Sequence, residues 1–221
     1  HLLGRGLLYA DRFGALQVQG SARYGSDAVR RIARLPTGGD YSESALLDAQ
    51  QRLTDSGYFD AAFLALQSDA ADPQAAPVVA QVREAALQKL VLGVGASTDS
   101  GLRLSVDHTH NRLPWLGWRA LSKVSMDRNT QSINSDWTAL PDGNGWHWFT
   151  QAQVQRDATG STMVHSSRLR GGRGKISKRI DRFLALQFDS ADSQGAGAPP
   201  SSAALSLHYG WTGRYFNQHT N

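Results

Sequence analysis

Residues 87–107 read LQKLVLGVGASTDSGLRLSVD. Successive side chains of an extended chain point to opposite faces, so this stretch presents Leu and Val on one face and mostly Lys, Gly, Arg and Asp on the other. The turn-like sequence STDSG at 97–101 divides it into two runs of similar pattern. These residues therefore predict a β-hairpin with one apolar and one polar face.

The alternation continues through the rest of the chain. We expect eight strands in about 130 residues, because no helical spacing interrupts the pattern. The composition, with 40% hydrophobic residues, 19% charged residues and 22 glycines, is typical of membrane barrels, whose polar lining and turns use uncharged residues and Gly. After the first hairpin, strands are expected over 118–127, 131–140 and 146–157, from Thr162 onward, and around 184–188 and 205–211.

Aromatic residues favour a membrane barrel over a soluble sheet, although a soluble sandwich alternates as well. Trp and Tyr prefer the headgroup zone of a bilayer, so rings at strand ends are expected in a barrel. The rings at or near expected strand ends are Trp115, Trp118, Trp146, Trp148, Trp211 and Tyr215. The membrane interpretation requires Leu92, Val106 and Leu207 to face lipid rather than pack inward.

The first 86 residues follow a different period. An extended segment is expected over 7–19, with Ala15, Leu16 and Val18 as core candidates. One helix should begin at 25–27 and stop at Leu35-Pro36, and a second should run from Ser42 to Gly57. Strands are expected over 61–68 and 77–84. The predicted order is therefore β-α-α-β-β.

This order and its motifs resemble the POTRA (polypeptide-transport-associated) family. The residues that match the family signature are Gly39, Tyr41, Gly57, Tyr58 and Phe59. Residues 93–103 and 111–117 resemble the first hairpin and first periplasmic turn of the outer-membrane assembly superfamily, and are most similar to its TamA branch. The resemblance implies an α+β POTRA domain followed by all-β antiparallel transmembrane barrel strands, about eight in number and an incomplete barrel.

The expected organisation has three parts. Residues 1–13 are the end of a preceding segment or the first POTRA strand, 14–86 the POTRA domain, and 87–221 the N-terminal half of an outer-membrane β-barrel. The chain opens with His1 and has no signal pattern, so we expect a mature protein or an internal fragment. An open half-barrel leaves backbone groups unpaired in lipid, so the isolated chain is not expected to be a stable membrane protein.

The resemblance implies an outer-membrane protein assembly and insertion factor, with its POTRA domain in the periplasm. Its implied partners are unfolded outer-membrane clients of autotransporter type, outer-membrane lipids and the inner-membrane-anchored protein TamB. A two-partner-secretion transporter of the same superfamily is the near alternative. A passive porin-like channel is a third, but it leaves the β-α-α-β-β domain without a purpose.

The first barrel strand is a candidate lateral gate. The resemblance places the seam of the closed barrel at this strand, whose candidate residues are Leu90, Leu92, Gly93, Val94 and Gly95. Glycines weaken strand packing, so this strand could unpair and accept a client strand. Alternatively, the two glycines only leave room for neighbouring side chains.

A second candidate is a basic run between two expected strands. Its residues are Arg168, Arg170, Arg173, Lys175, Lys178, Arg179 and Arg182, interleaved with Gly171, Gly172 and Gly174. We expect Arg170 to Arg179 to form a solvated periplasmic turn, with anionic lipid headgroups as an alternative ligand. Nucleic acid is not expected as a partner, although the net charge is +4, because this run has no aromatic residue before Phe183.

Catalysis and metal binding are not expected. The chain has no cysteine, hence no thiolate chemistry. His108, His110, His147 and His165 with Asp107 could be arranged into a phospholipase-like triad, but no nucleophile elbow supports it. His108 and His110 share a strand face without identifiable further ligands. We therefore predict a protein that is not an enzyme and has no cofactor.

Overall fold

The computed structural model describes residues 12–67, 75–177, 180–195 and 198–213. The chain divides into two compact units between Ala85 and Ala86. Neither helix of the described residues is long and apolar enough to cross a membrane.

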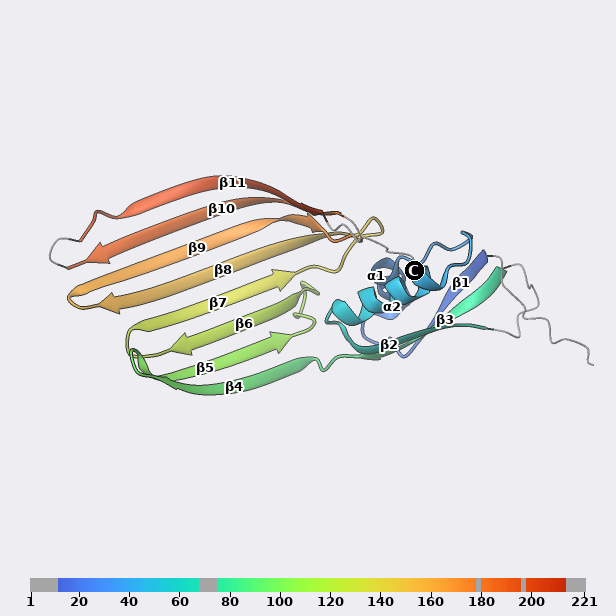
Figure 1. The fold of residues 1–221 in the computed structure, drawn as a ribbon, viewed down its shortest axis with the longest axis horizontal. Helices are drawn as coiled ribbons and strands as arrows, with labels where there is room; N and C mark the ends of the chain where they lie inside the picture. Colours follow the sequence, from blue (N-terminus) through green and yellow to red (C-terminus); the bar gives the residue numbers. More distant parts are fainter. Residues whose placement is uncertain (1–11, 68–74, 178–179, 196–197, 214–221) are drawn as a thin grey trace, which may run out of the picture. The chain divides into compact units, whose positions relative to one another are not determined.

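The first unit has the predicted β-α-α-β-β order (Figure 1). Its sheet has the strand order β1-β3-β2, in which β1 is parallel and β2 antiparallel to β3. Helix α1 contacts β1, and helix α2 contacts α1 and β2. The elements are β1 Arg12–Gln19, α1 Gly25–Ala33, α2 Glu43–Asp55, β2 Phe59–Leu66 and β3 Ala75–Glu84.

The predicted helix ends lie within two residues of the observed ones. The side chain of Ser42 accepts a hydrogen bond from the Ala45 N–H at the start of α2, as a good N-cap does. After α2, Gly57 has φ of +72°, a conformation that costs glycine little because it has no Cβ. The end of α1 is different, since Arg34 itself adopts the left-handed conformation.

The core of the first unit lies between the helices and the sheet. Its largest fully buried side chains are Phe13, Val29, Leu53, Phe59 and Val78. Leu16 is buried as expected, but Val18 is half-buried and Ala15 is exposed. The prediction for Ala15 was wrong because the β1–β3 register shifts between Phe13 and Leu16, which places Phe13 in the core instead.

The second unit is a single sheet of eight strands, as predicted (Figure 1). Every strand is antiparallel to its neighbour, and sequence order is also spatial order, from β4 at one edge to β11 at the other. The strands are β4 Gln88–Ser97, β5 Gly101–His110, β6 Arg119–Met126, β7 Thr130–Thr138, β8 Trp146–Thr159, β9 Thr162–Lys175, β10 Ile180–Gln194 and β11 Ser202–Gly213.

Strands β8 to β10 are longer than the sequence pattern indicates. They have 14, 14 and 15 residues, and their pairing continues through glycine-rich positions that we expected in a turn. Gly172 is one of these, and a Cβ there would lie 2.2 Å from the Leu184 carbonyl oxygen. Close backbone approach, rather than a turn, explains this glycine.

Candidate functional site

The register of the sheet assigns its two faces. Directly paired residues of antiparallel strands point to the same side. Leu92 pairs with Val106 and Val94 with Leu104, so the apolar residues of the first hairpin share a face as predicted. Residues that pair from strand to strand across the sheet form a row. The row that begins with Leu92 and Val106 continues through Val124, Ile133, Val154, Ser167, Ser190 and Ala203.

The apolar face is exposed. Val94, Leu92 and Leu207 are 76%, 71% and 72% exposed. Among the described elements, each strand of this sheet contacts only its neighbours in the sheet, so no described helix or second sheet covers the face. A continuous apolar surface of this kind marks contact with a partner or a membrane.

The apolar positions run obliquely to the rows of paired residues. Leu92 of β4 and Ala203 of β11 belong to the same row. In β11, however, the large residues of this face lie at Leu205, Leu207, Tyr209 and Trp211, displaced toward the C-terminal end of that strand. The apolar positions are thus displaced along the strands from one edge of the sheet to the other. If the strands are tilted, as in a barrel, this displacement brings the apolar residues to the same height and forms one band.

Two solved structures share this fold. BamA from Haemophilus ducreyi lacking POTRA domains 1–3 is 15% identical, with a TM-score of 0.63, and the match covers 94% of this chain and 45% of that one. CdiB from Acinetobacter baumannii is 12% identical, with a TM-score of 0.64, and the match covers 95% of this chain and 44% of that one. This chain therefore spans a little under half of each.

No protein-family model and no curated protein matches the sequence. At these identities the two structures establish similarity of fold alone.

The five residues of the candidate gate all lie in β4. In the described sheet β4 is an edge strand that pairs only with β5. Leu90, Leu92 and Val94 are on the exposed apolar face, and Gly93 and Gly95 are on the opposite face, beside Ser105 and Arg103. The structure thus brings the candidate residues together on one free strand.

The two glycines of β4 have different surroundings. A Cβ at Gly93 would lie 2.4 Å from the Oγ of Ser105, whereas a Cβ at Gly95 would meet nothing within 4 Å. Leaving room for a neighbour can therefore explain Gly93 but not Gly95.

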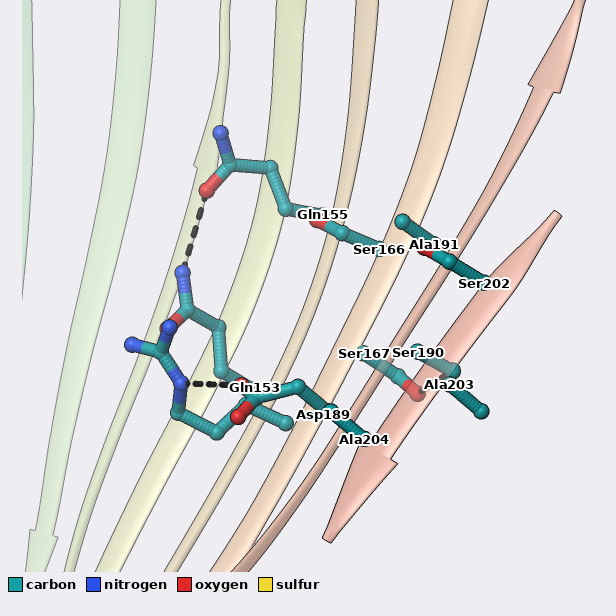
Figure 2. A pocket seen from close by; sticks show the side chains of 11 residues that line it. Gln153, Gln155, Ser166, Ser167, Asp189, Ser190, Ala191, Ser202, Ala203 and Ala204 are labelled. Atoms are coloured by element: carbon teal, nitrogen blue, oxygen red, sulfur yellow. Dashed lines mark hydrogen bonds and ion pairs between the residues drawn. The ribbon is translucent and has the colours of Figure 1, made fainter. Parts of the chain in front are cut away.

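The polar face carries ion pairs between strands. Lys123 pairs with Asp107 at 3.5 Å, and Arg168 with Asp189 at 2.7 Å. A hollow of about 460 Å³ lies on this part of the sheet. Figure 2 shows the small Ser and Ala side chains that line it beside Gln153, Gln155 and Asp189. Hydrogen-bonding groups and small side chains are what a water-filled barrel wall requires.

The turn between β6 and β7 is held by a buried carboxylate. The side chain of Asp127 is 3% exposed and accepts hydrogen bonds from Arg103 and from the N–H groups of Asn129 and Thr130. The bond from Arg103, followed by those from the backbone, holds the pKa of Asp127 below 3.8. The carboxylate therefore stays charged and organises the turn.

The predicted basic turn was wrong in its placement. Arg170, Arg173 and Lys175 lie in strand β9, while Lys178 and Arg179 lie outside the described residues. Alternating positions also send them to different faces. The local sequence, rich in Arg and Gly, looks like a turn because its strand conformation depends on pairing with β8 and β10, which the residues of β9 alone do not reveal.

Arg170 belongs to the polar face. Its guanidinium lies 4.8 Å from the ring centroid of Phe183 and 5.7 Å from that of Phe149. These aromatic partners come from the two neighbouring strands, so a scan along β9 alone does not find them. The arrangement is a cation–π stack that orders the wall.

Arg173 and Lys175 belong to the apolar face, at its rim. Arg173 forms an ion pair with Asp142 at 2.6 Å and lies 5.4 Å from the Trp146 ring centroid and 5.8 Å from that of Trp148. The tryptophans and the arginine can each be recognised in the sequence. Their adjacency cannot, because only the register of the strands brings them together.

The POTRA-like signature residues pack in the first unit. Tyr58 and Phe59 are buried, and the Tyr24 ring lies edge-on to both, at 5.2 and 5.7 Å. Tyr41 packs on Phe13 with centroids 5.4 Å apart. The Gly39 carbonyl accepts a hydrogen bond from the Phe13 N–H. Four of the five signature residues therefore hold the core and the start of β1 together, and Gly57 lies in the connection after α2.

The histidines are not brought together into a catalytic group. His108 and His110 share a face with ring centroids 6.2 Å apart, whereas His147 and His165 lie on β8 and β9. No group of three or more His, Asp or Glu residues that could hold a metal occurs in the described part of the chain.

Proposed function

We propose that this chain is part of an outer-membrane protein that assembles or secretes client proteins. In this proposal residues 14–86 are a periplasmic POTRA domain and residues 87–221 are the N-terminal half of a transmembrane barrel. The observation that carries the proposal is a meandering sheet with an uncovered apolar face and a hydrogen-bonding opposite face, directly after a β-α-α-β-β unit. The similarity of fold to BamA, a protein that has POTRA domains, supports the proposal.

The proposed POTRA domain would bind unfolded chains by strand addition. Its β2 pairs only with β3, so one edge of β2 has no strand partner among the described residues. Phe63 on this strand is 60% exposed. Backbone groups at a sheet edge bind extended peptides with little demand on their sequence. This property suits a protein that handles many clients.

Strand β4 would act as the lateral gate at which a client strand enters the membrane. Gly95, whose missing side chain no neighbour requires, supports this role. A glycine with free space around it weakens the packing of the strand, and no neighbouring side chain requires it for steric reasons. It therefore makes it easier for β4 to separate from a partner strand.

The finer assignment is the TamA branch, with autotransporter-like clients, outer-membrane lipids and TamB as partners. It is supported by the motifs at 93–103 and 111–117. A two-partner-secretion transporter is the second candidate, because it too would combine a POTRA domain with a barrel. Both candidates are non-enzymatic.

Site-directed crosslinking tests the gate in the full-length protein. Single cysteines replace Leu90, Leu92 or Val94 on β4, and Val154 on the central strand β8 serves as the control. During active transport, client crosslinks are expected at the β4 positions and not at Val154. Absence of β4 crosslinks while clients are still assembled would refute the gate.

Depletion of the full-length protein separates the two candidates. Selective loss of autotransporter-like proteins from the outer-membrane proteome supports the assembly factor. Loss of one secreted partner supports the secretion transporter. If the first unit binds no extended peptide and the proteome is unchanged, the passive channel is correct instead.

A further inference from the structure

At one rim of the apolar face, four neighbouring strands each contribute a basic or a tryptophan side chain to one row of paired residues. Trp146 of β8 pairs with Lys175 of β9, Lys175 pairs with Arg182 of β10, and Arg182 pairs with Trp211 of β11. Directly paired residues share a face, so the two cations lie side by side between two tryptophans. Arg173 and Tyr209 belong to the next row of the same face.

The two central cations lack an acidic neighbour. Like charges placed directly opposite in a sheet repel each other, and this repulsion requires a counter-charge. At this rim Asp142 forms an ion pair, and its partner is Arg173. Lys175 and Arg182 form no ion pair with any described residue. The row is therefore a place for an external anion.

The surroundings specify what carries that anion. One and two rows further into the sheet the same face becomes apolar, with Leu184, Leu186 and Leu207 all more than half exposed. Trp211 is 63% exposed beside the cations. Indole rings and basic side chains at the boundary of an apolar surface match the headgroup level of a bilayer. A ligand with a phosphate next to acyl chains satisfies both regions.

We propose that Lys175 and Arg182, supported by Arg173 and flanked by Trp146 and Trp211, bind the headgroup phosphate of an anionic phospholipid. The inference rests on the proposed placement of the sheet in the outer membrane. The row lies at the end of the sheet where β4 begins, directly after the first unit. With that unit in the periplasm, this rim meets the inner leaflet, which supplies phospholipid.

The test uses the full-length protein in phosphatidylcholine nanodiscs that contain increasing phosphatidylglycerol, with bound lipid counted by native mass spectrometry. Each basic side chain near an anionic surface strengthens binding about five-fold, so K175Q/R182Q should weaken phosphatidylglycerol binding about thirty-fold. The matched control is K89Q/K123Q, which removes the same charge from the polar face and should bind as wild type does. A second variant, K175E, can pair with Arg182 across the strands, and it should also lose the lipid.

Each remaining outcome overturns the proposal in a distinguishable way. Equal phosphatidylglycerol binding by wild type, K175Q/R182Q and K175E would remove the site. Preference of the wild type for lipopolysaccharide over phosphatidylglycerol would place the rim in the other leaflet. A wild-type protein that enters bilayers but binds no phosphatidylglycerol refutes this inference alone, whereas one that enters no bilayer refutes the proposed function as well.

Discussion

At the scale of single residues, Asp127 shows how one charge organises a tight connection. Its carboxylate accepts bonds from the N–H groups of Asn129 and Thr130 at 2.9 and 2.7 Å, and from Arg103 across the sheet. A carboxyl whose folded pKa is lower than its unfolded pKa stabilises the fold fully above the unfolded value. That stabilisation is lost as the pH falls through the folded value.

The expected consequence is an acid-sensitive turn. Asp127→Asn should lower stability at neutral pH, and its stability should change less than that of wild type as the pH falls below 3.8. Urea unfolding of the full-length protein in detergent, from neutral pH to about pH 3, measures this difference. Asp99→Asn, in the exposed turn after β4, is the matched control and should follow wild type. The same acid dependence in wild type and Asp127→Asn would contradict this role.

In strand β4, adjacent residues lie on faces of different polarity. Leu92 lies on the uncovered apolar face and is 71% exposed. Val91 lies on the other face, paired with Asp107. The solvent exposure of Leu92 and Val91 does not by itself distinguish their roles. The membrane interpretation does, because it places Leu92 against lipid and Val91 on the polar side.

We therefore expect Leu92→Arg to be costly and Val91→Arg to be tolerated. In a membrane barrel, an arginine on the lipid face near the bilayer midplane costs about 2–4 kcal/mol. An arginine at position 91 would instead lie on the polar face, opposite the carboxylate of Asp107. Reversible urea unfolding of the full-length protein in lipid vesicles compares the two variants. Equal destabilisation by both would mean that the face bearing Leu92 does not contact lipid.

At the scale of the whole molecule, the two units follow different stabilising principles. The first unit buries Phe13, Leu53 and Phe59 in its own core, whereas the large apolar residues of the second unit point outward. The first unit therefore depends on the hydrophobic effect within its own core, whereas the second unit, in the proposed membrane placement, would bury its apolar face in lipid.

A smaller side chain in the core of the first unit should accordingly lower the free energy of unfolding of that unit. Leu53 is fully buried in α2, so Leu53→Ala should lower the free energy of unfolding by about 2–5 kcal/mol. Leu47 on the same helix is 55% exposed, and Leu47→Ala should change it by no more than about 0.5 kcal/mol. Circular dichroism during urea unfolding of residues 12–86 provides the measurement. Similar losses in both variants would show that α2 does not pack as described.

Much of the architecture could be predicted from sequence because its signals are local. Ser42 and Gly57 mark the ends of α2 through hydrogen bonding and backbone conformation within a few residues. The alternation of Leu90, Leu92 and Val94 assigns faces without knowledge of any partner strand. The prediction that Ala15 lies in the core was wrong because the register of β1 with β3 shifts at this point.

The order of helices and strands, and the apolar side of most strands, could be predicted from the sequence, since both follow from the chemistry of neighbouring residues. Only the tertiary structure decided that β4 is an edge, that Arg170 and Arg173 lie in a strand on opposite faces, and that Lys175 faces Arg182 between two tryptophans. The physical reason is that register is a relation between strands. Residues far apart in the chain become neighbours through the hydrogen bonds of their backbones, which no single-strand pattern records.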